Sequence, residues 1–261
     1  RSLFGNELGS ANATEVVNAF SDYQAAIEQM DLKSFISIPS WIPLPGSNMK
    51  KAEVAAKRIH AVVDDIIEKS MQRNIEGSLL GLFLEAAGDE KHEALTLVQI
   101  RNELIVLFMA GHETTANTLA WAWYLISQSP ATEKRIHAEI EEVTGGRQPD
   151  YHDYGKLIYT RAVLDETMRL YPPVPILSRQ STSEDYVRNR KIPPDSIMLV
   201  VPWLLHRHKQ YWDKPDHFIP ERFLPDAPVK INKYTYLPFS IGPLVCLGKY
   251  FGQIELVMCL A

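Results

Sequence analysis

Cysteine is scarce in this sequence of 261 residues, which contains only Cys246 and Cys259. Two cysteines are too few for a disulfide framework and cannot by themselves form a cysteine-rich zinc site. This usage is typical of a protein from a reducing compartment. An excess of basic charge is also lacking, because 27 Lys and Arg stand against 32 Asp and Glu, for a net charge of -5. The sequence therefore offers no general basic field, and we expect no nucleic-acid partner.

Long hydrophobic runs are missing as well. The apolar stretches at 105–110 and 118–126 are separated by Gly, His and Glu at 111–113, and neither approaches the ~20 apolar residues that a spanning helix needs. The sequence therefore predicts no membrane-spanning helix. The chain begins at Arg1 instead of Met and ends within an apolar run. We expect both ends to continue in a longer protein, whose missing N-terminus leaves membrane attachment open.

Proline is rare in the first part of the chain, because twelve of the 17 prolines lie between Pro172 and Pro243. Apolar residues at three- and four-residue spacing predict amphipathic surface helices at 16–30 and 52–71, separated by a run of helix breakers at 37–47. Hydrophobic residues make up 46% of the sequence and charged residues 23%. This composition provides enough apolar side chains for a folded core.

The segment 95–128 contains no proline and one glycine, which predicts a helix of ~50 Å. It is apolar over most of its circumference, so we expect it to be buried on several sides. Helices are also predicted at 132–143 and 159–170. Beyond them we expect a strand at 197–201, a proline-punctuated meander at 211–245 and a last helix at 247–261. The predicted fold class is mainly α with small β-sheets.

A polar cluster interrupts the middle of the long helix at His112, Glu113, Thr114 and Thr115, directly after Gly111. Glycine lets a flat ligand lie against a helix, and threonines can open a helix by bonding to carbonyls one turn earlier. A carboxylate buried there would need a partner, water or a proton. The cluster indicates a groove with an acid and a hydroxyl, and a solvent-facing polar stripe is the alternative. A zinc-protease motif is excluded because Ala116 replaces its second histidine.

Glu166 and Arg169 lie one helical turn apart, directly before the sequence Leu-Tyr-Pro-Pro. A second arginine, Arg222, stands within the sequence Pro-Glu-Arg-Phe. A carboxylate flanked by two arginines can form a buried bidentate network that pins the meander to the helix. The alternative is an exposed ion pair worth ~0.5 kcal/mol.

The loop 239–248 leads into the last predicted helix and carries Cys246. Backbone N–H groups at the start of a helix favour a thiolate. Gly242 and Gly248 allow tight turns and the close approach of a planar ligand. We therefore interpret Cys246 as a ligand.

Two further candidates are interpreted as structural. Cys259 lies in an apolar helix and is expected to be a small core residue. The sequence His-Arg-His at 206–208 has no acid or histidine at a spacing that completes a metal site.

Taken in this order, the three elements resemble the haem-thiolate monooxygenases of the cytochrome P-450 family. The matching segments are Ala110-Gly111-x-Glu113-Thr114-Thr115, the E-x-x-R pair Glu166 and Arg169, the proline-flanked Arg222 and the cysteine loop 239–248. The resemblance implies a cytochrome P-450 haem-thiolate fold that is incomplete at both ends. Residues 1–261 would form a single domain fragment, helical over 1–170, with strands, meander and cysteine loop over 171–261.

The resemblance also implies a role for each matched residue. Cys246 is expected to bind the iron of haem b, with the cofactor contacted by Phe239, Gly242, Gly248, Gly111 and Arg179. The expected catalytic residues are Glu113 and Thr114, because an acid and a hydroxyl can order water and pass protons. The expected structural residues are Glu166, Arg169 and Arg222, and the expected substrate-lining residues are Ala110, Val174, Ile176 and Leu177.

The implied activity is hydroxylation or epoxidation of an apolar small molecule with dioxygen. Electrons would come from NAD(P)H through a flavoprotein reductase or a ferredoxin, which Lys233 and Lys249 could dock. The implied location is cytoplasmic, or cytosol-facing on the endoplasmic reticulum if the missing N-terminus carries an anchor.

One position departs from the family pattern. Leu244 stands where the family usually has an arginine that pairs with a haem propionate, and the lost hydrogen bond could cost ~1.5–3 kcal/mol. Arg179 matches another propionate-binding arginine and could compensate in part. Two alternatives stay open: a truncated or degenerate chain that binds haem weakly and catalyses nothing, and a peroxide-rearranging enzyme of the same fold. Such enzymes tend to lose the acid–hydroxyl pair that Glu113 and Thr114 retain.

Overall fold

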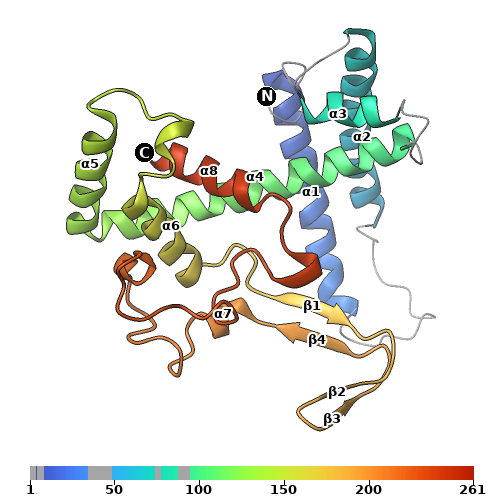
Figure 1. The fold of residues 1–261 in the computed structure, drawn as a ribbon. Helices are drawn as coiled ribbons and strands as arrows, with labels where there is room; N and C mark the ends of the chain where they lie inside the picture. Colours follow the sequence, from blue (N-terminus) through green and yellow to red (C-terminus); the bar gives the residue numbers. More distant parts are fainter. Residues whose placement is uncertain (1–3, 5–8, 35–48, 74–77, 88–94) are drawn as a thin grey trace. The chain divides into compact units, whose positions relative to one another are not determined.

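The computed structural model describes residues 4, 9–34, 49–73, 78–87 and 95–261. Figure 1 shows their elements in chain order. They fall into two compact units, 1–110 and 111–261, and helix α4 (Leu97–Ser127) contributes to both. Each unit has a hydrophobic core of its own.

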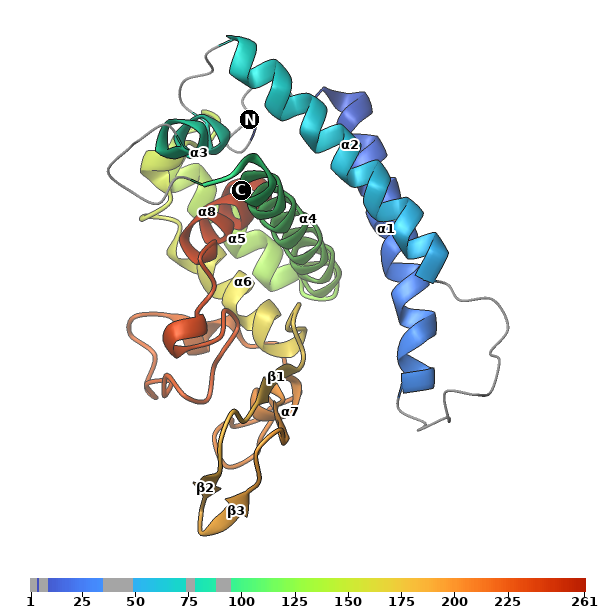
Figure 2. The same ribbon diagram turned by 90° about the vertical axis from the view of Figure 1, so that its right-hand side faces the viewer.

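The first unit is helical and contains α1 (Ser10–Ser34), α2 (Met49–Arg73), α3 (Leu79–Ala87) and the first half of α4. Helices α1 and α2 lie side by side, as Figure 2 shows. Ala19 and Ile59 are buried where the two helices meet. At the edge of this contact, Arg58 donates to Glu15 and Asp22 at 2.7 Å each. The apolar stripes expected from the sequence spacing therefore pack against each other.

The second core of this unit joins α2, α3 and α4 around Leu80, Ile100 and Leu104, which are 0% exposed. Helix α4 begins with a reciprocal cap. The N–H of Gln99 donates to Thr96 Oγ1 at 3.2 Å, and the N–H of Thr96 donates to Gln99 Oε1 at 2.8 Å. Helix α3 was not predicted, because its almost uniformly apolar sequence gives no clear period.

The second unit has one core, formed by the second half of α4, α5 (Pro130–Thr144), α6 (Ile158–Leu170) and α8 (Lys249–Leu260). Ala122 of α4, Val163 of α6 and Leu256 of α8 are at most 3% exposed in it. The core therefore fixes α8, which follows the cysteine loop, against α4 and α6.

Two small antiparallel sheets complete this unit. Strand β1 (Leu177–Gln180) pairs with β4 (Ile197–Val200), and β2 (Asp185–Val187) pairs with β3 (Arg190–Ile192). The β2–β3 hairpin turns at Arg188 and Asn189, both with positive φ, as expected for a tight hairpin. The short helix α7 (Pro202–Leu205) follows β4 and precedes the meander.

The predicted mainly α fold class with small β-sheets is confirmed. The helices predicted at 95–128, 132–143 and 159–170 match α4, α5 and α6, and the strand predicted at 197–201 matches β4. The helix breakers at 37–47 lie outside the described residues. Among the described residues, no helix is long and apolar enough to cross a membrane.

The expectation that the long helix is buried on several sides is wrong for part of α4. Val106 is 60% exposed, Trp123 55% and Tyr124 53%. The second half of α4 packs its Ala122 and Ile126 side on α6 and α8. The described part of the second unit places no comparable core on the side that carries Trp123 and Tyr124.

Candidate functional site

The cysteine loop is a compact turn held by its own backbone. The N–H of Cys246 donates to the carbonyl O of Phe239 at 2.9 Å, and the N–H of Val245 donates to the carbonyl O of Gly242 at 3.1 Å. Gly242 has φ 76°, a left-handed conformation that favours glycine. Phe239 packs against the core of the second unit. The structure therefore brings Phe239, Gly242 and Cys246 together in one loop.

Cys246 is exposed, and so are the apolar side chains beside it. Leu244 is 62% exposed and Leu247 92%. A Cβ added to Gly248 would lie 3.9 Å from Cys246 Sγ, so the backbone is close to the sulfur. An exposed thiol in an apolar, glycine-framed surface is suited to a flat apolar ligand.

The donor set around Cys246 is a single thiol. In the part of the chain that the structure describes, no three His, Cys, Asp or Glu side chains come together as a metal site. A lone thiol cannot complete the tetrahedral coordination of a structural zinc ion. It does suit an iron atom whose other ligands come from a porphyrin. The residues present therefore fit a haem.

Cys246 lies shortly before the last helix but not at its first residue. Helix α8 begins at Lys249 after Gly248, and the N–H of Lys249 lies 3.4 Å from the carbonyl O of Cys246. The last helix was predicted to begin at residue 247, directly after the cysteine, and it begins at Lys249 instead. The expectation that Cys259 is a core residue is wrong, because Cys259 is exposed on α8.

Glu166 and Arg169 form the buried network that the sequence indicated. Arg169 Nε lies 2.7 Å from Glu166 Oε2 and Nη2 lies 2.8 Å from Oε1, and both side chains are 0% exposed. Arg222 Nε lies 3.4 Å from Glu166 Oε1, and the N–H of Ile219 donates to the same oxygen at 2.8 Å. The alternative of an exposed ion pair is therefore wrong. The network joins α6 to the meander.

The α4 cluster is more exposed than the sequence predicted. Gly111 and Glu113 are exposed, whereas Thr114 is half-buried. The carbonyl O of Thr114 accepts a hydrogen bond from Thr118 Oγ1 at 2.9 Å. A Cβ added to Gly111 would meet nothing within 4 Å. The premise of a buried carboxylate is wrong, because no described element of the second unit covers this face of α4, but the face leaves room for a ligand beside Gly111.

The residues expected to line the substrate pocket near β1 are accessible. Val174 is 43% exposed and Ile176 53%, while Leu177 is half-buried. Arg179 lies on β1, where its Nη1 donates to the carbonyl O of Ser178 at 2.7 Å. Val174, Ile176, Leu177 and Arg179 therefore lie in one short segment of the second unit. Ala110 belongs to the first unit.

A buried histidine that bonds the segment before the cysteine loop was missed. His206, interpreted only as structural, is 0% exposed, and its Nε2 accepts a hydrogen bond from the N–H of Leu237 at 2.8 Å. Burial lowers the pKa of His206 to about 4. No spacing rule links residues so far apart in the chain. The available signal was the apolar sequence Trp-Leu-Leu directly before the histidine.

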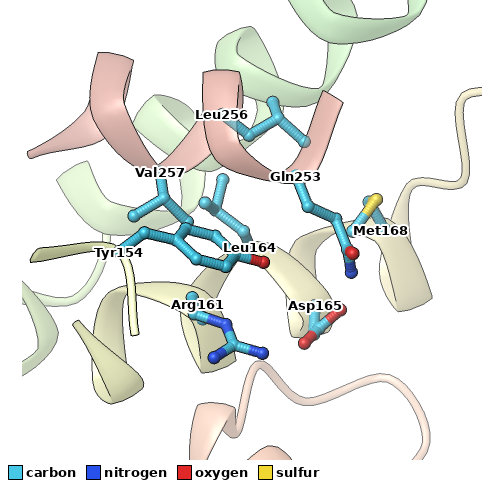
Figure 3. A pocket seen from close by; sticks show the side chains of 8 residues that line it. All are labelled: Tyr154, Arg161, Leu164, Asp165, Met168, Gln253, Leu256 and Val257. Carbon is cyan, nitrogen blue, oxygen red and sulfur yellow. The ribbon is translucent and has the colours of Figure 1, made fainter. Parts of the chain in front are cut away.

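A half-buried acid was also missed. Asp165 lies on α6 beside a small pocket formed with α8 (Figure 3). Tyr236 Oη lies 2.9 Å from the carbonyl O of Asp165 and 3.0 Å from its Oδ1. Burial raises the pKa of Asp165 to about 6, and the Tyr236 hydroxyl together with Arg161 and Lys249 opposes this only in part. The pair forms a second link between α6 and the meander.

Comparison with known proteins identifies the family. The family profile described as Cytochrome P450 matches residues 1–261, and the chain belongs to the cytochrome P450 family. It is 32% identical over 268 residues to cyclooctatin synthase of Streptomyces melanosporofaciens, covering 100% of this chain and 57% of that protein. It is 30% identical over 262 residues to cyclooctat-9-en-7-ol 5-monooxygenase of the same organism, covering 100% and 56%.

A plant relative is similar over the same range. The chain is 31% identical over 283 residues to LUTEIN DEFICIENT 5, chloroplastic, of Arabidopsis thaliana, covering 100% of this chain and 46% of that protein. The chain thus spans about half the length of the curated relatives that it matches. Haem b is the cofactor of this family, and the thiol and apolar surface of the cysteine loop fit it.

Proposed function

We propose that this chain is the haem-binding part of a monooxygenase that hydroxylates or epoxidises an apolar small molecule. The observation that carries the proposal is the exposed thiol of Cys246 in a loop framed by Gly242 and Gly248, with exposed Leu244 and Leu247 beside it. The name of one relative, cyclooctat-9-en-7-ol 5-monooxygenase, supports the reaction class. In such a reaction one oxygen atom of dioxygen enters the substrate and the other leaves as water, with two electrons and two protons consumed.

In this proposal each residue has a limited task. Cys246 binds the haem iron, and the bound haem supplies the activation of dioxygen. The Cys246 backbone is held by the carbonyl O of Phe239. Gly111 leaves open space beside α4 for the flat cofactor. Arg179 binds a propionate, a task that Leu244 cannot share because it has no hydrogen-bond donor.

Proton delivery is assigned to α4. Thr114 holds a water molecule with its hydroxyl, and the exposed carboxylate of Glu113 exchanges protons with solvent. The substrate contacts the apolar side chains of Ala110, Val174, Ile176 and Leu177. The exposure of Val174 and Ile176 supports this assignment.

Electrons are proposed to come from NAD(P)H through a flavoprotein reductase or a ferredoxin. Lys233 and Lys249 are the basic residues closest in sequence to the cysteine loop, and they would attract an acidic partner. The proposed location is the cytoplasm or a cytosol-facing membrane surface. That residues 1–261 form a single domain fragment also stays a prediction.

The test is turnover of the complete gene product with NAD(P)H, its reductase and isotopically labelled dioxygen. We expect one labelled oxygen atom in the product. Thr114→Ala should keep oxygen consumption but lower the product formed per oxygen by ~10²-fold or more. Asn117→Ala, an exposed polar position on the same helix, is the control and should leave this ratio unchanged. A product without label would refute the monooxygenase, and unchanged coupling in Thr114→Ala would remove that residue from proton delivery.

A further inference from the structure

His206 connects the ion-pair network of α6 to the segment that leads into the cysteine loop. It directly follows α7, and its side chain is among the largest that are fully buried. Its carbonyl O accepts a hydrogen bond from Arg169 Nη1 at 2.8 Å. Its ring Nε2 accepts one from the N–H of Leu237, also at 2.8 Å. The backbone of His206 is thus tied to α6, and its side chain is tied to the meander.

Two further hydrogen bonds lead from Leu237 to the cysteine. The carbonyl O of Leu237 accepts from the N–H of Ser240 at 3.3 Å, and the carbonyl O of Phe239 accepts from the N–H of Cys246 at 2.9 Å. Ser240 has φ 61°, a left-handed conformation that is uncommon for residues other than glycine. Such a conformation persists only where the surrounding contacts hold it. An anchor at Leu237 therefore restrains the residue that fixes the Cys246 backbone.

The imidazole is itself held in place. Tyr236 packs against it with ring centroids 5.2 Å apart, and the Tyr236 hydroxyl is held by Asp165. The ring is neutral at ordinary pH, because burial lowers the pKa of His206. A neutral ring that accepts at Nε2 carries its proton on Nδ1. The acceptor for Leu237 is therefore available without any titration.

We infer that His206 is a positioning residue for Cys246, acting through Leu237 and Phe239. The inference rests on the proposed role of Cys246 as the iron ligand. His206 fixes the loop in its ligating conformation before haem binds, so that the sulfur position does not depend on the cofactor alone. A ligand held within ~0.5 Å of its working position needs such supporting contacts.

The test compares His206→Phe with His206→Gln in the complete gene product. Phenylalanine fills the space of the ring but has no acceptor, whereas glutamine can place an oxygen near Nε2. In the haem-free protein, we expect His206→Phe to speed amide hydrogen exchange over residues 237–246 about tenfold, and His206→Gln to restore most of the protection. In the haem-bound protein, His206→Phe should convert part of the thiolate-type carbon monoxide spectrum to the thiol type.

The matched control is Val163→Ala, which opens a cavity in the core of the same unit but removes no hydrogen bond of residues 237–246. It should lower stability but leave exchange over 237–246 slower than in His206→Phe, with the thiolate spectrum intact. Equal effects of Val163→Ala and His206→Phe would overturn the positioning role. So would unchanged exchange in His206→Phe.

Wild-type protein gives a second measurement that needs no variant to fold. The Leu237 amide should be protected as strongly as the amides of α6, and exchange at the rate of an exposed loop would overturn the inference. The exchange measurements do not involve haem. Failure of Cys246 as a ligand would therefore leave the exchange result standing and alter only the spectrum, which separates the two proposals.

Discussion

Arg169 binds Glu166 through two hydrogen bonds, from Nε to Oε2 at 2.7 Å and from Nη2 to Oε1 at 2.8 Å. The remaining N–H groups of Arg169 donate to carbonyl oxygens of the meander and the segment before it, at His206, Pro215 and His217. All five donors of the guanidinium are therefore used. This buried side chain therefore connects α6 to chain segments 37 to 48 positions away.

Arg169→Lys is expected to destabilise the protein by about 3–5 kcal/mol, although it keeps the charge. Lysine has three donors on one atom and cannot bind the carboxylate in a bidentate way while it also reaches three carbonyls. Urea unfolding measures the loss. Lys57→Gln, which breaks the exposed pair with Glu53, is the control and should cost less than about 0.5 kcal/mol. Similar losses in both variants would contradict a dominant role for the buried pair.

Asp165→Asn is expected to stabilise the protein above about pH 6 by roughly 2–3 kcal/mol. The pKa of Asp165 is raised from 3.8 to about 6 in the folded chain. Its contribution to stability is therefore present below the unfolded pKa and is lost as pH rises through about 6. Asparagine keeps an acceptor oxygen for Tyr236 and carries no charge at any pH. Urea midpoints across this pH range should show the advantage shrinking toward about pH 4, and a constant difference would contradict the raised pKa.

His206 should produce the opposite pH dependence. Its pKa falls from 6.5 to about 4 on folding, so the unfolded chain takes up the proton first as pH decreases. Stability present above about pH 6.5 should be lost toward about pH 4, by about 3 kcal/mol in full. Asp165 titrates in the same pH range. The comparison is therefore best made between the single variant Asp165→Asn and the double variant that also carries His206→Gln. An equal pH slope with and without His206 would contradict the lowered pKa.

Gly111→Ala should affect helix stability and haem binding in opposite directions. The added methyl group meets no protein atom within 4 Å. A helix with alanine at an interior position is about 1 kcal/mol more stable than one with glycine. We therefore expect the haem-free protein to become more stable, as measured by thermal unfolding, while haem content falls. Gly252→Ala on α8 meets no atom either and should be stabilising without loss of haem. Equal haem content in the two variants would contradict a cofactor contact at Gly111.

The sequence predicted those parts of the fold that local rules determine. Helix α4 could be inferred because its segment has no proline and only one glycine, and α5 and α6 because their helical patterns stop at Gly145 and at the Tyr-Pro-Pro segment. The network of Glu166 with its two arginines was also predictable. Glu166 and Arg169 lie one helical turn apart, and a guanidinium can bind a carboxylate through two hydrogen bonds.

The rest depends on contacts between distant residues. The bonds from His206 to Leu237 and from Asp165 to Tyr236 span 31 and 71 positions, and no periodicity reports them. The exposure of Glu113 could not be inferred either, because a mostly apolar helix pattern does not say which side of the helix lacks a packing partner. The residue types of the cysteine loop could be recognised in the sequence. The long-range contacts that hold the segment before it could be seen only in the tertiary structure.

The proposed function depends most on the bond between Cys246 and the haem iron. The most direct measurement is the absorption spectrum of the reduced carbon monoxide complex of the haem-loaded complete gene product, for wild type, Cys246→Ala and Cys259→Ala. We expect the red-shifted Soret band of a thiolate complex in wild type and in Cys259→Ala, which removes the other exposed cysteine, and its loss in Cys246→Ala. The same spectrum in wild type and Cys246→Ala would contradict the assignment.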